Sequence, residues 1–393
     1  MISFSSACHI LKTFSPVLRV HTIALPDACG RVCARDIRAK EDSPAFHKSQ
    51  RDGFAVRSRE AVCGAVLPVT GYAFAGKPFR GFLTSGTCVG IATGAELPRG
   101  ADAVIRKEDV QVKDGRIYLF RPAQKNDFVL SRGRECIRGA RLLSQGTCLG
   151  PAQVGLLASQ GIFSLAAYRP PAVSILATGS ELAGPAQSKP RGCIYDASSP
   201  MLASWIRRMG LQPVVLGPAG DEPDGLRKKI RRALMSDVLI VTGGVSVGDK
   251  DFIPQILRQE GVVCRFHTVA LKPGKPIWFG TKGSKRIFAL PGNPVSAFVG
   301  FRLFVKPFLE KALGLRGDLV FSRGFLSRPV SNADPRLAFL PCRLEKHEGR
   351  TRICPLKDRG SSDLVTLARA EGLFLCDPLS KKRGNAAALY LSL

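Results

Sequence analysis

Residues capable of chemistry cluster in the stretch SDVLIVTGGVSVGDKDF, residues 236–252, where Asp249 and Asp251 directly follow a glycine-rich turn. The turn contains Gly243, Gly244, Ser246 and Gly248. Glycines let the backbone approach a ligand closely, and free N–H groups at such a turn favour anions such as phosphate. Two carboxylates beside an anion site require a cation between them, and Mg²⁺ prefers one or two carboxylates with phosphate oxygens. The stretch therefore predicts a phosphate-bearing ligand held through a metal ion.

The segment from Gly244 to Gly248 also matches G-x-S-x-G, the nucleophile elbow of serine hydrolases. That interpretation needs an acid and then a histidine downstream, where only His267 and His347 are available, and His267 is too close in sequence for the usual order. Carboxylates beside a developing oxyanion are also unfavourable. The phosphate interpretation is therefore favoured over the hydrolase interpretation.

The surrounding pattern predicts a parallel sheet that positions this turn. Residues 238–242 form a short apolar, β-branched run, typical of a buried parallel strand. From about residue 170 strands and helices alternate, with helices at 200–209, 226–234, 253–259 and a long one at 294–313, which indicates a doubly wound, mostly parallel α/β domain. Ligands bind beyond the carboxyl ends of such strands. Other predicted strand ends there carry Thr178, Gly179, Ser180 and Glu181, then Lys272 and Lys275 before an aromatic strand, and Pro291, Gly292, Asn293 and Pro294.

Composition limits the class of protein. The 58 Lys and Arg against 31 Asp and Glu give a net charge of +27, but the basic residues are dispersed, no nucleic-acid motif occurs and aromatic residues are only 7%. We therefore interpret the charge as a compositional bias that also steers anionic substrates, and expect neither a nucleic-acid nor a membrane partner. The start of the chain lacks the pattern of a secretory signal, so a cytoplasmic location is expected. The 12 cysteines show no C-x-x-C spacing and predict reduced thiols rather than a zinc site.

Several motifs in order along the chain carry a resemblance to a known family. They include SPAFHKSQRDGFAV (43–56), IATGAELPRGADAVIRKED (91–109), ATGSEL (177–182), GCIYDASSPML (192–202), the glycine turn, LKPGKPIWFG (271–280), ALPGNPVSAF (289–298) and RGSSDLVTLARAEGL (359–373). Together they resemble the molybdopterin molybdotransferases of the MoeA family, which are related to the E domain of gephyrin. The likeness covers essentially the whole chain.

The resemblance implies a four-part homodimer. It predicts an elongated linker domain from residues 1–40 and 131–168, an inserted β domain at 41–130, a molybdopterin-binding α/β domain at 169–315, and a C-terminal β-barrel-like domain at 316–393. The implied active site is shared between subunits. The implied reaction uses Mg²⁺ to release AMP from adenylylated molybdopterin while molybdenum from molybdate is inserted. The upstream adenylyltransferase and the recipient molybdoenzymes are the expected partners.

Roles for individual residues follow from the matching motifs. The resemblance implies catalytic roles for Asp52, Glu181 and Asp251, with metal binding by Glu181, Asp221, Asp249 and Asp251. The substrate-binding residues that it implies are Thr93, Gly94, Thr178, Gly179, Ser180, Gly243, Gly244, Ser246, Gly248, Lys272, Lys275, Pro291, Gly292, Asn293, Pro294, Arg336 and Ser361.

Departures from the family pattern leave alternatives open. The acidic position of the family's G-E-D-I segment is Cys136, its F-D-x-S segment reads Phe46-His47-Lys48-Ser49, and an expected arginine after Arg336 is replaced around Pro341. A non-catalytic or attenuated molybdopterin-binding scaffold is therefore the alternative to a catalytic transferase. A third possibility, the adenylyltransferase that precedes insertion, resembles the α/β domain alone and does not explain the two β domains.

Overall fold

The computed structural model describes residues 1–184, 189–220, 222–245, 252–357 and 359–393. Two compact units emerge from the packing. The first comprises residues 1–21, 30–32 and 167–393, and the second comprises residues 22–29 and 33–166. Ser246, Gly248, Asp249, Asp251 and Asp221 of the predicted site lie outside the described residues.

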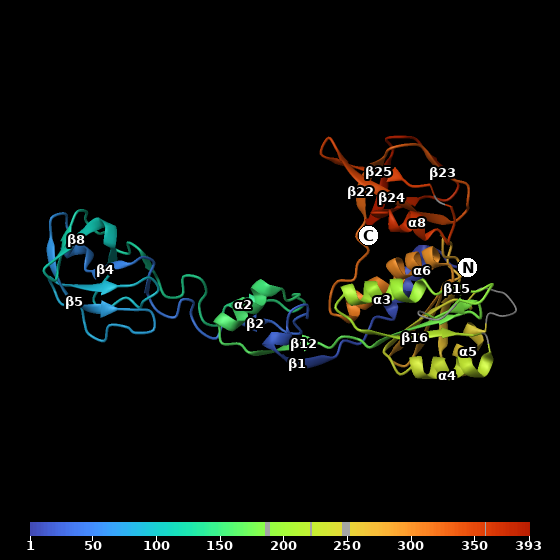
Figure 1. Cartoon of the computed structure of the whole chain (residues 1–393), viewed down its shortest axis with the longest axis horizontal. Helices are drawn as coiled ribbons and strands as arrows, with labels where there is room; N and C mark the ends of the chain where they lie inside the picture. The colour runs from blue at the N-terminus through green and yellow to red at the C-terminus, as the bar shows by residue number, and fades with distance from the viewer. Residues whose placement is uncertain (185–188, 221, 246–251, 358) are drawn as a thin grey trace. The chain divides into compact units, whose positions relative to one another are not determined.

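The second unit is built mainly from short strands, as its frequent turn signals predict. Its largest sheet has six strands in the order β7-β4-β6-β5-β9-β8 (Figure 1). The strands are β4 (Gly53–Val56), β5 (Val66–Ala73), β6 (Cys88–Ile91), β7 (Ala103–Arg106), β8 (Val110–Lys113) and β9 (Arg116–Leu119). Its remaining elements are the strand pairs β2 (Ile37–Arg38) with β11 (Arg141–Leu143) and β3 (Lys48–Ser49) with β10 (Val129–Leu130), the helix α2 (Pro151–Ser159), and the 3₁₀ turns η1 (Leu25–Asp27), η2 (Ser58–Glu60) and η3 (Lys107–Asp109). The paired strands β1 (Val20–Ala24) and β12 (Ser164–Tyr168) each have residues in both units.

The first unit contains the predicted α/β sheet, with six strands in the order β16-β13-β17-β21-β20-β18. They are β13 (Val173–Thr178), β16 (Pro213–Ala219), β17 (Val238–Thr242), β18 (Val263–His267), β20 (Trp278–Lys282) and β21 (Lys285–Leu290). β16, β13, β17 and β21 are parallel, whereas β20 pairs antiparallel with both β21 and β18. Only β20 therefore runs against the other strands, and its pairing with β21 follows from the short link between Lys282 and Lys285, since so tight a connection permits only a hairpin.

Helices cover both faces of this sheet, as Figure 1 shows. α3 (Ser198–Arg208), α6 (Pro294–Gly300) and α7 (Lys306–Ala312) lie on one face, and α4 (Pro223–Ala233) and α5 (Ile253–Gln259) lie on the other. The first unit also contains α1 (Phe4–Thr13) and the short pair β14 (Leu182–Ala183) and β15 (Ile194–Tyr195). All five residues of β17 are buried, as expected of a strand covered on both faces. The predicted doubly wound, mostly parallel domain is confirmed.

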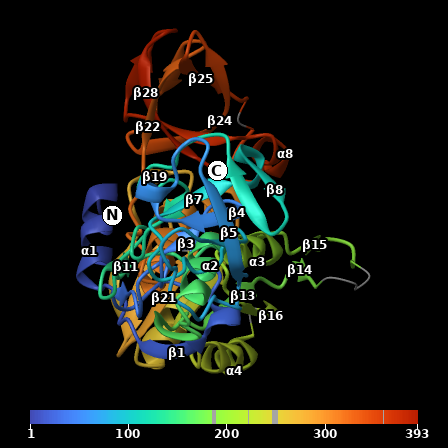
Figure 2. The ribbon, with the colours of Figure 1, turned by 90° about the vertical axis from the view of Figure 1, so that its left-hand side faces the viewer.

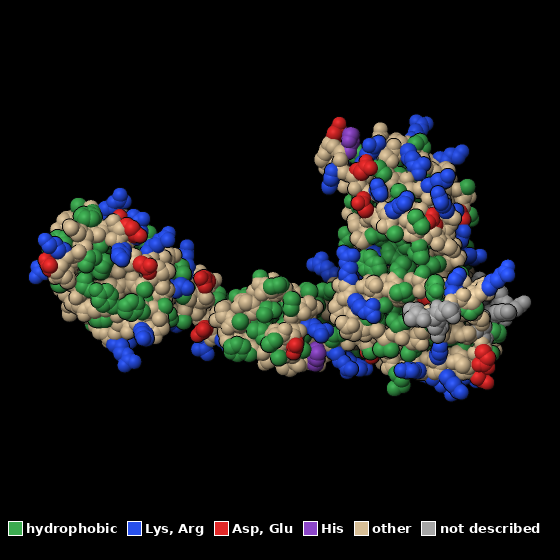
Figure 3. Space-filling view, in the orientation of Figure 1, with side chains coloured by type: hydrophobic (Ala, Val, Ile, Leu, Met, Phe, Trp, Pro, Cys, Tyr) green, Lys and Arg blue, Asp and Glu red, His purple; other side chains and the backbone are tan. Residues whose placement is uncertain are grey.

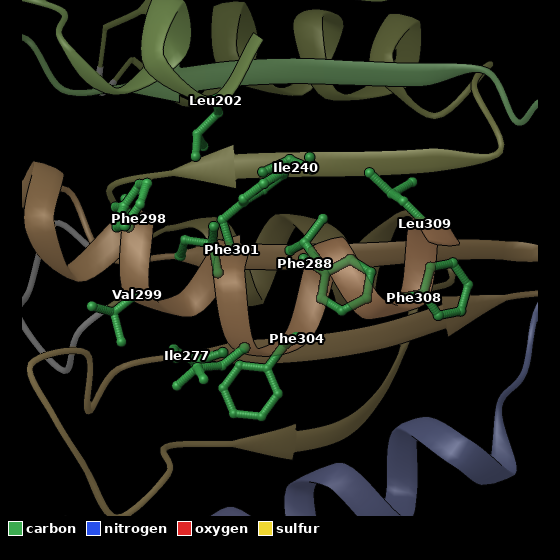
Figure 4. Packing of buried hydrophobic residues seen from close by; sticks show 14 of the residues in the cluster. Leu202, Ile240, Ile277, Phe288, Phe298, Val299, Phe301, Phe304, Phe308 and Leu309 are labelled. Atoms are coloured by element: carbon green, nitrogen blue, oxygen red, sulfur yellow. The ribbon is translucent and has the colours of Figure 1, made fainter. Parts of the chain in front are cut away.

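The predicted long helix from residue 294 to 313 is one helical stretch, but it is not a regular α-helix. Five residues between α6 and α7, η4 (Phe301–Val305), are π-helical, and all five are buried. Phe301 and Phe304 point into the core beside Phe288 and Phe308 (Figure 4). No sequence pattern predicts this segment, because the apolar spacing is compatible with an uninterrupted α-helix.

The C-terminal strands close on themselves. β24, β25, β22, β28 and β26 pair in turn, and β26 pairs again with β24, so these five strands form the predicted barrel-like domain (Figure 2). The elements of this region are β19 (Leu271–Lys272), β22 (Ser322–Leu326), β23 (Val330–Asn332), β24 (Leu337–His347), β25 (Arg350–Pro355), α8 (Leu364–Ala368), β26 (Gly372–Cys376), β27 (Ser380–Lys382) and β28 (Ala387–Ser392). Its core is continuous with that of the α/β sheet through Phe339, Leu373 and Leu391. The predicted four-domain division stays a prediction.

Replacement of Phe288 by Ala tests the packing of this core. The Phe288 ring is fully buried, with its centroid 4.9 Å from that of Phe279 and 5.5 Å from that of Phe308. We expect Phe288→Ala to lower the free energy of unfolding by about 3–5 kcal/mol, because it removes the ring and leaves a cavity. Chemical denaturation measures the loss. Phe163→Ala, at a side chain that is 69% exposed, is the control and is expected to change stability little. Equal losses in the two variants would contradict the assignment.

Candidate functional site

A cavity of about 650 Å³ lies where the parallel strands β13, β17 and β21 end. This volume is typical of ligand sites, and the carboxyl edge of a parallel sheet is where such sites occur. We call it the strand-end pocket. Its lining includes Thr178, Gly179, Glu181, Leu182, Ile194, Tyr195, Asp196, Ala197, Ser198, Thr242, Gly243, Gly244, Val245, Pro276, Pro291, Gly292, Asn293, Pro294, Ser362 and Leu364.

The start of the glycine turn requires glycine. Gly243 and Gly244 have φ angles of +89° and +63°, and a Cβ atom on Gly243 would lie 2.3 Å from the carbonyl oxygen of Thr178. The Gly243 N–H donates to the carbonyl oxygen of Leu290 at 3.0 Å. The turn is therefore fixed against the ends of both neighbouring strands, and its backbone forms part of the pocket wall.

Glu181 lies on the adjacent turn, after β13. Gly179 has a φ of +146° and its N–H donates to Ala219 O at 3.0 Å. A Cβ atom on Gly179 would lie 2.5 Å from Glu181 Oε2 and 2.6 Å from Oε1, so the carboxylate folds back over that glycine. Ser180, between them, is exposed. The side chain of Glu181 thus faces the pocket from a backbone that only glycine accommodates.

Sequence reasoning missed several lining residues. Asp196 Oδ1 accepts a hydrogen bond from the Ser199 N–H at 3.0 Å at the start of α3. Tyr195 precedes it and is 55% exposed at the pocket. An Asp just before a helix, with its carboxylate able to accept from a backbone N–H three residues on, is a helix-start signal that the segment YDASSP does carry.

A segment distant in sequence completes the pocket beside the predicted PGNP turn. Asn293 Nδ2 donates to Ser361 Oγ at 2.8 Å, and Ser362 Oγ donates to Asn293 Oδ1 at 3.0 Å. The Val295 N–H also donates to Ser361 O, at 3.1 Å. Ser361 therefore holds Asn293 in place, whereas Ser362, which sequence reasoning did not single out, lines the pocket itself.

Lys272 and Arg336 meet at Asp334, a residue that the sequence analysis did not single out. The guanidinium of Arg336 donates to both carboxylate oxygens of Asp334, at 2.7 and 2.6 Å, and Lys272 Nζ lies 3.7 Å from Asp334 Oδ2. Hydrogen bonds from Arg336 hold the pKa of Asp334 well below its usual range. The parallel pairing of β19 with β24 brings these groups together. Lys275 is exposed next to Pro276, a pocket residue.

The predicted residues of the second unit also come together. Asp52 Oδ1 accepts from the Thr93 N–H at 2.7 Å and from Thr93 Oγ1 at 2.9 Å. These bonds, with the nearby charge of Lys107, lower the pKa of Asp52. The Gly94 N–H donates to Ser49 O at 2.8 Å, and Gly53 must be glycine since a Cβ would lie 1.8 Å from Ile105 O. Asp52 is thereby held as an exposed carboxylate.

The family departures have ordinary local surroundings. Cys136 forms a β-bridge with Ser43, and its Sγ lies 3.8 Å from Gln160 Nε2. His47 Nδ1 accepts from the Arg132 N–H at 3.4 Å. Pro341 lies within β24 opposite Leu373. None of these substitutions disturbs the strands around it.

The carboxylates of the described residues at the strand-end pocket suit a hard cation, but they are too few to form a complete coordination shell for it. Glu181 and Asp196 contribute oxygens to the strand-end pocket, the donor type that Mg²⁺ prefers. No group of three or more His, Cys, Asp or Glu within metal-binding reach occurs in the described part of the chain. Asp221, Asp249 and Asp251, the other predicted ligands, lie outside that part.

The close contact between the Gly243 backbone and the Thr178 carbonyl oxygen can be tested by comparing substitutions at Gly243 and at a glycine without such a contact. We expect Gly243→Ala to lower the free energy of unfolding by about 1–3 kcal/mol or more, because it adds a clash to an unfavourable φ. Gly210 has a similar φ of +78° with no atom within 4 Å of a built Cβ. Gly210→Ala therefore isolates the cost of φ alone, about 1 kcal/mol. Thermal unfolding compares the two, and equal losses would argue against the close approach.

The Asp334 pair predicts a pH-dependent contribution to stability. Pairing with Arg336 lowers the pKa of Asp334 in the folded chain. The pairing therefore contributes its full stabilisation of the folded chain at pH values above the pKa of Asp334 in the unfolded chain, about 3.9. As pH falls from there toward the folded pKa, the unfolded chain takes up the proton first and the stabilisation is lost. Asp334→Asn should therefore lower the midpoint of urea unfolding at pH 6, and the difference from the parent should shrink below pH 4. A difference that does not change between these pH values would exclude the assignment.

Three segments of the chain match models of known protein families. Residues 2–161 match the family model described as MoeA N-terminal region (domain I and II), residues 174–311 match a probable molybdopterin binding domain, and residues 323–383 match MoeA C-terminal region (domain IV). A Bacillus subtilis protein named molybdopterin molybdenumtransferase is 32% identical over 90% of this chain and 85% of its own length. A Haemophilus influenzae protein of the same name is 37% identical over 74% of this chain and 72% of its own.

Solved structures agree with the sequence comparison. Two crystal structures of MoeA proteins from Pyrococcus horikoshii superpose with TM-scores of 0.88 and 0.81 at 28% and 26% identity. Each covers all of this chain, and this chain covers 99% and 100% of them. Since relatives above 30% identity and these structures extend over most or all of its length, the chain belongs to the MoeA family.

Proposed function

We propose that this protein is a molybdopterin molybdenumtransferase of molybdenum cofactor biosynthesis. It would insert molybdenum from molybdate into adenylylated molybdopterin and release AMP. The observation that carries the proposal is the strand-end pocket, in which a glycine turn, Glu181 and the Asn293 turn meet at one edge of the sheet. The names of relatives matched over most of this chain support the same activity.

The chain's own groups suit a substrate that contains a pyrophosphate. The backbone of Gly243 and Gly244 lines the pocket, and glycine backbone in such a turn suits the close approach of phosphate oxygens. Tyr195 offers an exposed aromatic ring at the pocket for a flat heterocycle. Lys272 and Arg336 place positive charge at Asp334, where an incoming molybdate dianion is attracted.

Mg²⁺ is proposed as the cofactor. Glu181 would hold it, with Asp221, Asp249 and Asp251 as the further carboxylates. When bound, the ion would offset the negative charge on the pyrophosphate that is split. Glu181 keeps its carboxylate folded over Gly179 and directed at the pocket, which orients one oxygen donor before the substrate arrives.

We also propose that the protein acts as a cytoplasmic homodimer whose active site is shared between subunits. Asp52 of one subunit would then serve the pocket of the other. Because two hydrogen bonds from Thr93 keep its pKa low, Asp52 is suited to act as a carboxylate, orienting water or a cation, rather than as a proton donor. The upstream adenylyltransferase and recipient molybdoenzymes would be its partners. No described helix has the length and hydropathy of a membrane span.

Release of AMP tests this function. Purified protein with adenylylated molybdopterin should release AMP only when both Mg²⁺ and molybdate are present. Asp251→Ala should lower the rate by at least about 100-fold, since removal of a charged group in a phosphate site costs several kcal/mol. Asp377→Ala, at an exposed aspartate on the C-terminal domain, is the matched control and should keep the parent rate.

The same experiment decides between catalysis and a scaffold. If the parent binds adenylylated molybdopterin but releases no AMP under any combination of ions, the non-catalytic alternative replaces the transferase. Complementation of a strain that lacks molybdenum insertion gives an independent readout. The parent gene should restore molybdoenzyme activity, and the Asp251→Ala gene should not.

A further inference from the structure

A second cavity, whose lining shares no residue with the strand-end pocket, contains a buried arginine. Arg302 belongs to the π-helical segment and is only 5% exposed. π-Helical turns within α-helices are rare and occur frequently at functional sites. The segment places a charged side chain in the region where the α/β domain meets the C-terminal strand β28.

The charge of Arg302 lacks a carboxylate partner. Its guanidinium donates to the carbonyl oxygen of Ser392, but its buried Nε has no hydrogen-bond partner, and no carboxylate of the described residues pairs with it. Burial lowers the pKa of Arg302, the nearby carboxylate of Glu310 acts in the opposite direction, and the charge of Arg208 lowers the pKa further. A buried charge is normally paired, so this guanidinium is an unusual feature that needs an explanation.

The ring of Trp205 contacts the guanidinium groups of both Arg302 and Arg208. The Arg302 guanidinium carbon lies 4.6 Å from the centroid of the Trp205 ring, and that of Arg208 lies 5.2 Å from it. The face of an indole attracts cations, which offsets part of the cost of holding two guanidinium groups together. Both arginines thereby stay beside one aromatic surface.

These residues line a cavity of about 380 Å³, which we call the Trp205 cavity. Lys306 and Glu310 also line it and pair with each other, so Glu310 forms its ion pair with Lys306 rather than with either arginine. Leu313, Leu315 and Leu393 supply apolar walls. A neighbouring cavity of about 630 Å³ shares Trp205, Arg208 and Leu393, and hydrophobic side chains gather on this face between the C-terminal domain and α3 (Figure 3). The Trp205 cavity shares no lining residue with the strand-end pocket.

We propose that the Trp205 cavity binds a small organic anion, a carboxylate or phosphate carried on a flat apolar body. The anionic group pairs with the exposed Arg208 and with the part of the largely buried Arg302 that lines the cavity, and the apolar body packs on Trp205 and the leucines. Guanidinium groups suit planar, bidentate recognition of carboxylate and phosphate. The inference does not depend on the proposed transferase activity.

The two tryptophans of the chain, Trp205 and Trp278, make a direct test possible. Phenyl phosphate and benzoate are titrated separately into the full-length protein, followed by tryptophan fluorescence and by calorimetry. We expect a saturable fluorescence change that is absent from Trp205→Phe, in which only the fully buried Trp278 reports. The two probes distinguish phosphate from carboxylate as the preferred anion.

Matched variants locate the site. Arg208→Gln should weaken binding by at least about tenfold, the value of one charge-assisted hydrogen bond. Arg207→Gln removes a neighbouring exposed arginine that does not line the cavity, and should change affinity less than about twofold. Gly292→Leu adds a side chain to the strand-end pocket and should leave the affinity of the Trp205 cavity unchanged.

Three outcomes would overturn the proposal. The first is the absence of saturable binding of either probe at concentrations up to about 10 mM, because a Kd above that value is too weak for a specific site. The second is loss of binding in Gly292→Leu, which would assign the anion to the strand-end pocket. The third is an equal effect of Arg207→Gln and Arg208→Gln. If no probe binds and Arg208→Gln instead changes the oligomeric state by light scattering, the cavity is a contact between copies.

Discussion

The parallel register of β13, β17 and β21 is the constraint on which the functional site depends. Ala177 stands opposite Thr242, and Thr242 stands opposite Leu290, so all three strands end at one level. Each strand ends there and is followed directly by a turn. The three turns therefore share one edge, and a single pocket forms from segments more than 100 residues apart in sequence.

Close backbone packing at this edge explains why structural and functional requirements coincide. Gly243 sits against the Thr178 carbonyl oxygen, and Gly179 sits under the carboxylate of Glu181. Any side chain at either position would displace its neighbour. In the proposed function, the backbone of these glycines, which lines the pocket, would also receive the phosphate groups of the substrate.

Charge is distributed in three physically different ways. Most Lys and Arg side chains are scattered over the exposed surface, as Figure 3 shows for one face, and act through the long-range field of the protein. Lys272 and Arg336 are organised by Asp334 beside the β19–β24 pairing. Arg302 is buried beside Trp205 without a carboxylate. The second and third arrangements hold their cations in fixed geometry, and both anion-binding proposals rest on them.

The sequence by itself determined the elements and the chemistry of their ends. The buried strand at 238–242, the helix at 253–259 and the positions of the turn glycines follow from local pattern, because periodicity and backbone freedom depend on neighbouring residues. The tertiary structure alone decided which distant groups meet. Asp334 between Lys272 and Arg336, Ser362 at Asn293, and the π-helical turn that buries Arg302 all depend on packing between segments that no local pattern encodes.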